Sequence, residues 1–390
     1  MLGAAVHQSE MADILRRAHS NAPCASEAVA EVAGAFGSAD LAFVLLFISP
    51  DYDLQMIAQE TGQAFPDVPV LGCTTAGEIG QRGYETGTLV GLGFGAADFA
   101  IRTRLIHPLD RFSLDDGAEI AAELFAPDGV GEAALWPSSV MMLICDGLSR
   151  KEDAIVAALA PSLGAIPLIG GSAGDGLNFG ETFVLYGGKF HRNAAIAALI
   201  RTRCRIEAFR LDNFVPTETR MVVTGADPAE RLVTEINAEP AAREYARVVG
   251  KDPDQLSPFI FAENPVVVRI GGDHFCRSIQ QVENNGDLRF YCAIDEGLVL
   301  TVAGSMDIVR HLDERLAALR RGGEPLAVLG FDCVLRRLDV ESSQRTRDMS
   351  EVLARHGVVG FNTYGEQFGG MHLNQTFTGA AIYAPDPADV

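Results

Sequence analysis

The chain has 390 residues, of which 48% are hydrophobic and 21% are charged, a balance typical of a folded globular protein of about two domains. Its 31 basic and 52 acidic side chains leave a formal net charge of −21. Nucleic acids and anionic membrane surfaces require a basic protein surface, so the charge argues against both as partners. No signal peptide and no long uncharged apolar stretch is visible, and the seven cysteines lack CxxC spacing, so we expect a cytoplasmic location.

A first structural unit is predicted near the N-terminus, after residues 10–36, which indicate one or two amphipathic helices. An apolar run at 41–49 has the length and composition of a strand buried on both faces. The pattern then predicts a helix at 51–63, a second strand at 68–71, the turn GCTTAGE at 72–78 and a further strand at 88–94.

The same order of elements returns twice along the chain. The second copy is predicted as a strand at 139–146, a helix at 150–163, a strand at 166–169, the turn GGSAGD at 170–175, and strands at 182–186 and 194–200. The third is predicted as a strand at 326–332, a helix at 342–355, a strand at 358–359, the turn GFNTYGE at 360–366, and a strand at 376–383. A repeated unit of this size indicates a pseudo-symmetric fold, with its special site where the repeats face each other.

The segment 201–325 interrupts the second and third copies. It is expected to be helical at 230–249 around a break at Pro240, with strands and a hairpin between 265 and 303 and a helix at 307–321. These elements indicate an αβ insertion or a second sheet. The fold class is therefore α/β, mixed α+β, with internally repeated strand–helix–strand–Gly-turn–strand units that form two packed sheet-containing halves.

Each glycine turn ends with a carboxylate: Glu78, Asp175 and Glu366. Such a turn exposes backbone N–H groups to a ligand, and its carboxylate can hold an ammonium or a guanidinium; the alternative is that the three carboxylates only cap neighbouring turns. No GxxxxGK[ST] motif is present, so nucleotide binding is not expected.

Cysteines and arginines near the strand ends are further candidates. Cys145, which precedes Asp146, and Cys333 end predicted strands, where α/β proteins place their sites, but a nucleophilic thiol needs a histidine partner and the alternative is a buried core thiol. Arg269 lies in a strand predicted to be buried, and Arg336 follows Cys333. A buried arginine needs a carboxylate or an anionic ligand, and pairing with a turn carboxylate is the expected arrangement.

The eight histidines form no zinc motif, and CxxCH is absent, so covalent haem is excluded. Non-covalent haem needs only one axial ligand and an apolar pocket. His191, His274 and His372 are the candidates because each lies close to a glycine turn or a glycine pair.

Several of these motifs together resemble a known family. The stretches GCTTAGEIG, PLIGGSAGDG, GKFHRNAA, EPAAREYARVVG and VVGFNTYGEQFGGMHLNQTFTGAAIY resemble the FIST family of bacterial sensory proteins. The resemblance implies an N-terminal FIST domain at 30–215 and a C-terminal FIST domain at 220–385. It also implies a sensor of small ligands, for which amino acids have been proposed, and not an enzyme.

The segments FDCVLRR at 331–337, YGEQ at 364–367 and Met371-His372 look closest to the NosP-type branch. That branch implies haem b, nitric oxide sensing, and a partner that is a histidine kinase or a cyclic-di-GMP enzyme, either a diguanylate cyclase or a phosphodiesterase. No output module is recognisable, so we expect regulation in trans, with a homodimer as one possible state.

The candidate ligand-binding residues are those on or beside the turns and strand ends: Cys73, Thr74, Glu78, Cys145, Asp146, Asp175, Arg269, Cys333, Arg336, Asn362, Tyr364, Glu366 and Asn374. Two alternatives stay open. In a sensor of an amino acid without haem, the turn carboxylates would meet the ammonium, and Arg269 or Arg336 the carboxylate. In a cysteine-dependent enzyme, Cys145 or Cys333 would be the nucleophile.

Overall fold

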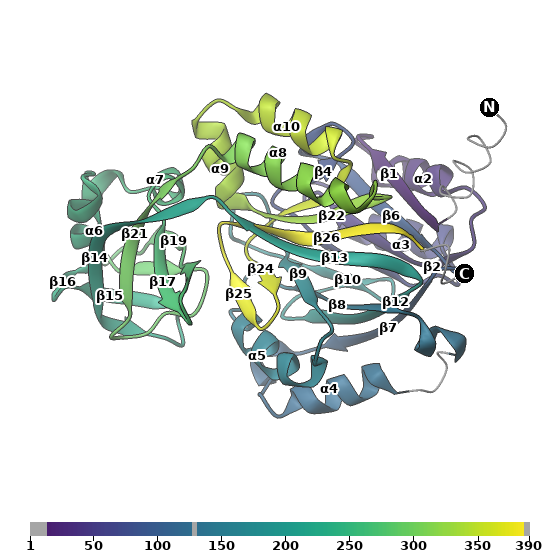
Figure 1. The fold of residues 1–390 in the computed structure, drawn as a ribbon, viewed down its shortest axis with the longest axis horizontal. Helices are drawn as coiled ribbons and strands as arrows, with labels where there is room; N and C mark the ends of the chain where they lie inside the picture. The colour runs from purple at the N-terminus through teal and green to yellow at the C-terminus, as the bar shows by residue number, and fades with distance from the viewer. Residues whose placement is uncertain (1–13, 127–130, 386–390) are drawn as a thin grey trace.

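The computed structural model describes residues 14–126 and 131–385, which form a large body and a smaller projecting domain (Figure 1). The body contains residues 14–126, 131–213 and 306–385. The projecting domain, called the insert below, contains residues 214–305 and lies at the left of Figure 1. Its ends are adjacent, because the Met306 N–H donates to the Asn213 carbonyl oxygen at 2.7 Å.

Three structural units of the same order build the body. The first is β1 (Leu15–Ser20), α2 (Ala25–Phe36), β2 (Leu41–Ile48), α3 (Leu54–Ala64), β3 (Val70–Thr74), the hairpin β4 (Glu78–Gly80) and β5 (Gly83–Glu85), and β6 (Leu89–Gly95). The second is β7 (Phe99–Ile106), α4 (Asp116–Phe125), β8 (Ser138–Cys145), α5 (Glu152–Leu163), β9 (Leu168–Ser172), the hairpin β10 (Val184–Tyr186) and β11 (Lys189–His191), and β12 (Ala195–Thr202).

The third unit is the one that the insert interrupts. It begins with β13 (Cys204–Asp212) and resumes at α8 (Ile308–Leu319), β22 (Ala327–Cys333), α9 (Val334–Ser342), α10 (Thr346–Arg355), β23 (Val358–Thr363), the hairpin β24 (Glu366–Phe368) and β25 (Met371–Leu373), and β26 (Thr376–Pro385). Both segments on which the sequence predicts a FIST domain therefore contribute elements to the body.

The three units exchange their hairpins in a cycle. The sheets have the strand orders β1-β6-β2-β3-β10-β11, β7-β12-β8-β9-β24-β25 and β13-β26-β22-β23-β4-β5. In each sheet the two central strands of one unit are parallel, and the hairpin next to them comes from another unit. The hairpin of unit one completes the sheet of unit three, that of unit two completes unit one, and that of unit three completes unit two.

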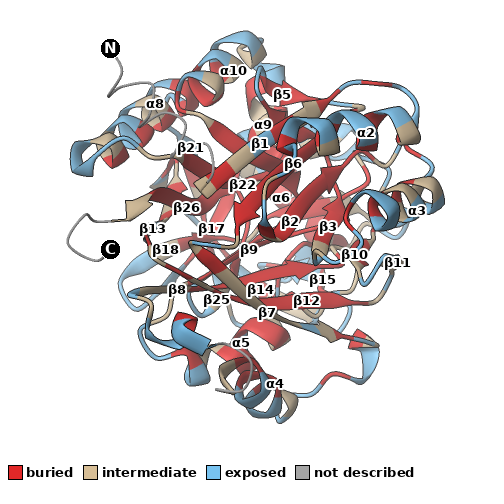
Figure 2. Cartoon of the chain, turned by 90° about the vertical axis from the view of Figure 1, so that its right-hand side faces the viewer, coloured by how far each residue is buried: buried red, intermediate tan, exposed pale blue. Residues whose placement is uncertain are grey.

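The sheets pack face to face around one apolar core, with helices on the outside (Figure 2). Side chains from all three units meet in this core; Phe47 and Phe361, for example, stack with ring centroids 4.9 Å apart. The strands are nearly continuous apolar runs because both of their faces are covered. Polar caps start two of the outer helices: Asp53 accepts from the Met56 N–H at 3.1 Å, and Asp307 from the Arg310 N–H at 2.9 Å.

Glycines recur in the units because neighbouring backbones come too close for a side chain. Gly72, Gly170 and Gly360 occupy the same place in β3, β9 and β23. A Cβ on any of them would lie less than 3.0 Å from the carbonyl oxygen of the parallel strand beside it. The repeated glycines of the sequence are therefore strand residues required by close packing as well as turn residues.

The insert has its own sheet, with the order β18-β17-β21-β14-β15-β20-β19 and β16 paired to β15. Its elements are β14 (Phe214–Asp227), β15 (Leu232–Ile236), β16 (Glu239–Pro240), α6 (Ala241–Val249), α7 (Pro258–Glu263), β17 (Val266–Ile270), β18 (Asp273–Cys276), β19 (Ile279–Val282), β20 (Leu288–Phe290) and β21 (Val299–Ser305).

Three expectations for local structure are wrong. Residues 15–20 form a strand instead of a helix, since they pair with β6 along their whole length. Residues 232–236 form β15, and only the part after Pro240 is helical. The single helix expected at 342–355 is two helices, because the chain turns at 343–345, with Gln344 in the left-handed region at φ +57°.

Candidate functional site

The three glycine turns meet in a closed ring of backbone hydrogen bonds. The first turn joins unit three, where the Ala76 N–H donates to the Asn362 carbonyl at 2.9 Å. The second joins unit one, where Gly174 N–H donates to the Thr74 carbonyl at 3.0 Å. The third joins unit two, where Ser172 N–H donates to the Gly365 carbonyl at 2.8 Å. The repeats therefore do face each other at their turns, and we call this arrangement the ring.

Glu78 and Glu366 hold equivalent places in the ring. Glu78 accepts from the Thr75 hydroxyl and from the hydroxyl and N–H of Thr88, the last two at 2.9 and 3.2 Å. Burial raises the pKa of Glu78 to about 7, although these hydrogen bonds oppose the shift. The carboxyl group is committed to its own unit, which favours the capping interpretation over an ammonium site.

Glu366 repeats this geometry with Thr363 and Thr376, whose hydroxyl and N–H lie at 2.8 and 3.2 Å from Oε2. Burial raises the pKa of Glu366 to about 8, because the side chain is completely enclosed. Two buried glutamic acids thus brace two of the three turns.

Asp175 differs because the second turn is one residue shorter. Its carboxylate accepts from the N–H groups of Phe179, Gly180 and Glu181 at 2.8 to 2.9 Å and from the Tyr364 hydroxyl. Nearby, Asp146 accepts from the Thr182 hydroxyl and from the Leu148 N–H at 3.0 Å, and burial raises its pKa. Asp175 therefore links units two and three.

Other candidate residues of the ring make structural contacts. The Thr74 hydroxyl accepts from Phe183 N–H at 3.1 Å, and the Asn362 side-chain oxygen accepts from Arg337 at 3.1 Å. The Asn374 amide donates to the Tyr364 carbonyl at 3.3 Å. These side chains hold the turns against each other.

Neither candidate arginine behaves as expected. Arg336 is buried, but its partners are Asp332 at 2.7 Å and Asn213, not a turn carboxylate. The Arg269 side chain is exposed, since it lies on the open face of β17 while its neighbours Val266 and Val268 face the core of the insert. It lines a groove of about 540 Å³ together with His274 and Arg220.

The candidate cysteines Cys73, Cys145 and Cys333 are completely buried. Burial raises the pKa of each thiol well above its ordinary range, so the thiols stay protonated near neutral pH. In the described part of the chain, no hydrogen bond joins any of them to a histidine. This arrangement is typical of core thiols and not of activated nucleophiles.

The three candidate histidines lie in three different places. His191 is on β11, with Nε2 at 3.2 Å from the Tyr186 carbonyl oxygen, and His274 lies in the groove on the insert. His372 is buried on β25; its Nδ1 lies 3.3 Å from the Gln367 amide nitrogen, and its Nε2 has no partner among the described residues. Burial lowers the pKa of His372, which favours the neutral imidazole. Within residues 14–126 and 131–385, no group of three or more metal-binding side chains is found.

The insert contacts the body beside the ring, on a surface that we call the seam. Arg231 of the insert reaches Glu152 and Asp153 of α5 at 2.8 and 2.9 Å and is almost fully buried. The Tyr291 ring of the insert lies 6.1 Å from the rings of both Phe179 and Tyr364. Sequence reasoning missed Arg231, Glu152 and Tyr291, because they belong to no motif and become neighbours only through folding.

Unpartnered polar atoms gather at the seam and at the third turn behind it. Among the described residues, buried atoms without a hydrogen-bond partner include Tyr291 Oη, His372 Nε2, Gln367 Oε1, Asn374 Oδ1 and Arg277 Nε. Each such atom costs about 1–3 kcal/mol. Folded proteins keep few of them, and a concentration in one region is typical of a site that awaits a ligand or ordered water.

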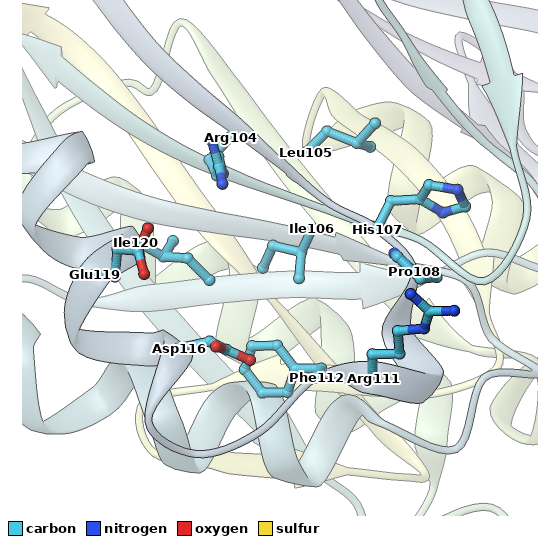
Figure 3. A pocket seen from close by; sticks show the side chains of 10 residues that line it. All are labelled: Arg104, Leu105, Ile106, His107, Pro108, Arg111, Phe112, Asp116, Glu119 and Ile120. Atoms are coloured by element: carbon cyan, nitrogen blue, oxygen red, sulfur yellow. The ribbon is translucent and has the colours of Figure 1, made fainter.

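A pocket of about 220 Å³ opens at the seam. Body and insert both line this seam pocket, and the lining residues are Gly147, Leu148, Arg150, Phe179, Arg231, Gln280, Gln281, Arg289, Phe290 and Tyr291. A second pocket of about 200 Å³ lies between β7 and α4, with Arg104 from the strand and Glu119 from the helix on its walls (Figure 3). No residue predicted from the sequence lines either pocket. The seam pocket is the better candidate because it lies between body and insert, and its lining residue Phe179 packs against Tyr364 of the third turn.

The body, its ring of turns and the insert leave a pocket between two parts of the chain, a common place for a small-molecule site in proteins. The FIST N domain profile matches residues 42–239, and the FIST C domain profile matches residues 241–369. The chain therefore belongs to the FIST family, whose domains are sensory modules of signal transduction. No curated protein matches it. Among the described helices, none is long and apolar enough to cross a membrane.

Proposed function

We propose that this FIST protein is a sensor that binds a small molecule at the seam and regulates a signalling protein in trans. The partner is a histidine kinase, a diguanylate cyclase or a phosphodiesterase. The observation that supports the proposal is the seam itself, where a pocket shared by two parts of the chain lies beside a cluster of unpartnered polar atoms.

The connection between insert and body suits a switch. Two strands carry the insert away from the body, and Asn213, at their base, accepts from buried Arg336. A ligand that contacts both sides of the seam stabilises one placement of the insert over others. The partner protein then binds differently according to the position of the insert relative to the body.

Amide hydrogen exchange tests this proposal. A metabolite screen by thermal shift would supply ligands, since a molecule that binds the native state raises Tm. The ligand should slow exchange at residues 145–150, 175–181 and 286–294, which face the seam. Protection confined to the groove on the insert or to the pocket beside α4 would contradict the proposal.

Haem b with nitric oxide is a second candidate, favoured by His372. Its Nε2 is buried and has no partner among the described residues, and burial favours the neutral ring. Iron would bind Nε2 with the ring proton on Nδ1, which requires the Gln367 amide to turn its oxygen toward Nδ1. The seam pocket itself does not fit haem. Its volume of about 220 Å³ is small for a porphyrin, and His372 is not one of its lining residues. Haem would bind only if the seam opened, and its iron would supply the site for nitric oxide.

An absorption spectrum of protein from haem-supplemented cells, taken before and after dithionite and nitric oxide, tests the haem candidate. A Soret band that shifts with nitric oxide and is lost in His372→Ala, but kept in His191→Ala and His274→Ala, supports it. The absence of a Soret band after added hemin overturns it.

A further inference from the structure

We infer that the seam pocket takes a small organic carboxylate with a flat apolar part. This inference rests on the proposed function, because it names the class of ligand for the same site. The volume of about 220 Å³ is small for haem and suits a molecule of the size of benzoate. The lining has no carboxylate to meet an ammonium, so the ligand differs from a free amino acid.

The charge of the lining favours an anion. Arg150, Arg231 and Arg289 line the pocket, and no carboxylate is among its lining residues. Each guanidinium already contacts an acid outside the lining: Arg150 contacts Glu230, Arg289 contacts Glu283 and Glu230, and Arg231 contacts Glu152 and Asp153.

Donors nevertheless remain for a ligand. A guanidinium carries five N–H groups, and the hydrogen bonds of Arg150 and Arg289 to described residues leave Nη2 of each unused. Both side chains are partly exposed, so these groups are free to meet a carboxylate that enters the pocket. Arg231 directs three of its N–H groups to the Tyr291 carbonyl oxygen, Glu152 and Asp153, and so holds the insert against α5.

Gln280 supplies a second, independent indication. Its side chain is only 8% exposed, yet its amide makes no hydrogen bond with the described residues. The neighbouring Gln281, in contrast, donates to Glu283 at 3.1 Å. The Gln280 amide is not among the fully buried unpartnered atoms, so it reaches the space of the pocket and is positioned to donate to a ligand oxygen.

Aromatic side chains define the flat part of the ligand. Phe179 and Phe290 line the pocket, and Phe179 is held with φ +52°, a conformation that bulky residues rarely adopt. Its ring packs against Tyr364, with the centroids 4.9 Å apart, which fixes its orientation. A strained backbone that holds an aromatic ring in one orientation, beside N–H groups without a partner, is typical of a binding site.

Isothermal titration of the full-length chain with matched pairs tests the inference. The probes are aromatic and aliphatic monocarboxylates without an amino group, each with its primary amide, such as benzoate with benzamide and hexanoate with hexanamide. At least one carboxylate should bind tenfold or more tightly than its amide. Gln280→Leu should weaken binding of that carboxylate at least tenfold, whereas Gln255→Leu, an exposed glutamine of the insert outside the pocket, should not.

Arg289→Ala should also weaken binding at least tenfold, and Arg243→Ala, an exposed arginine on α6, is the control. Circular dichroism checks that each variant folds. If Arg289→Ala does not fold, Gln280→Leu still tests the inference. Equal affinity for acid and amide, no binding by any carboxylate, or no effect of Gln280→Leu overturns the inference. If another metabolite or haem protects the seam, the proposed function survives; if nothing does, both proposals fail.

Discussion

At the residue scale, the two buried glutamic acids of the ring make stability depend on pH. Their pKa values of about 7 and about 8 in the folded protein lie above the ordinary value near 4.5, so the folded state binds these protons more tightly than the unfolded state does. Their stabilising contribution is complete below pH 4.5 and is lost as the pH rises through 7 to 8.

We therefore predict that Glu78→Gln and Glu366→Gln reduce the fall in unfolding free energy between pH 5 and pH 9. The effect of each is on the order of 3 kcal/mol, since one pKa unit is worth about 1.4 kcal/mol. Urea unfolding at several pH values measures it, with exposed Glu119→Gln as the control. A double variant with the same pH dependence as the wild type would contradict the assignment.

The strand glycines give a prediction with a control of opposite sign. Gly170→Ala and Gly360→Ala should destabilise the fold by about 3 kcal/mol, because the added methyl group meets the carbonyl of the parallel neighbour. Gly34→Ala, in α2 with open space around it, should stabilise by up to about 1 kcal/mol. Thermal unfolding of the three variants measures these changes in stability. If Gly170→Ala and Gly360→Ala are as stable as Gly34→Ala, the parallel strands can move apart to accept a methyl group.

At the element scale, α5 and the insert are joined by a buried ion pair. Arg231→Met leaves Glu152 buried without its partner, and we predict a loss of about 3–5 kcal/mol. The double variant Arg231→Met/Glu152→Gln should recover part of this loss. Denaturant unfolding measures both, and Arg347→Met, which removes an exposed pair with Glu351, should change stability by less than about 1 kcal/mol.

Elements with a strong local signal could be predicted from the sequence. The apolar runs before each glycine turn are strands, and the helix expected at 150–163 is α5 (Glu152–Leu163). The hairpins could not be predicted, because their three-residue strands carry little pattern and pair with strands of another unit. For the same reason residues 15–20 were misassigned, since their pairing with β6 outweighs local propensity.

The candidate site also has a part that could be predicted from the sequence and a part that could not. Glu78, Asp175 and Glu366 were visible because they end a repeated turn, and the structure does bring the three turns together. Gln280, Arg231 and Tyr291 carry no signal of their own. They belong to the seam only because the insert folds back against the ring, and the contacts that place them are all distant in sequence.

At the scale of the whole molecule, the exchanged hairpins make the body one folding unit while the insert is separable. A fragment of residues 1–212 lacks β23 and β24, so the hairpin β4–β5 and the strand β9 lose their partners. We predict that this fragment is unfolded or aggregated alone and folds when residues 213–390 are co-expressed. Co-purification with a tag on one fragment tests this; a folded monomeric fragment would contradict it.

Replacing residues 214–305 with a short Gly-Ser linker is the matched deletion. Because Asn213 and Met306 are hydrogen-bonded neighbours, we predict that the body keeps its fold and loses the seam. A cooperative thermal transition together with loss of any seam ligand would confirm that the insert is needed for sensing and not for folding.

The hairpin exchange also has a consequence during synthesis on the ribosome. The hairpin β4–β5 emerges early, but its partner strand begins at Val358, more than 270 residues later. The first unit must therefore wait with an open sheet edge while the rest of the chain is translated, and such edges invite pairing with other chains. We therefore expect the yield of folded protein to depend on how well this nascent edge is shielded, and not only on the final stability of the protein.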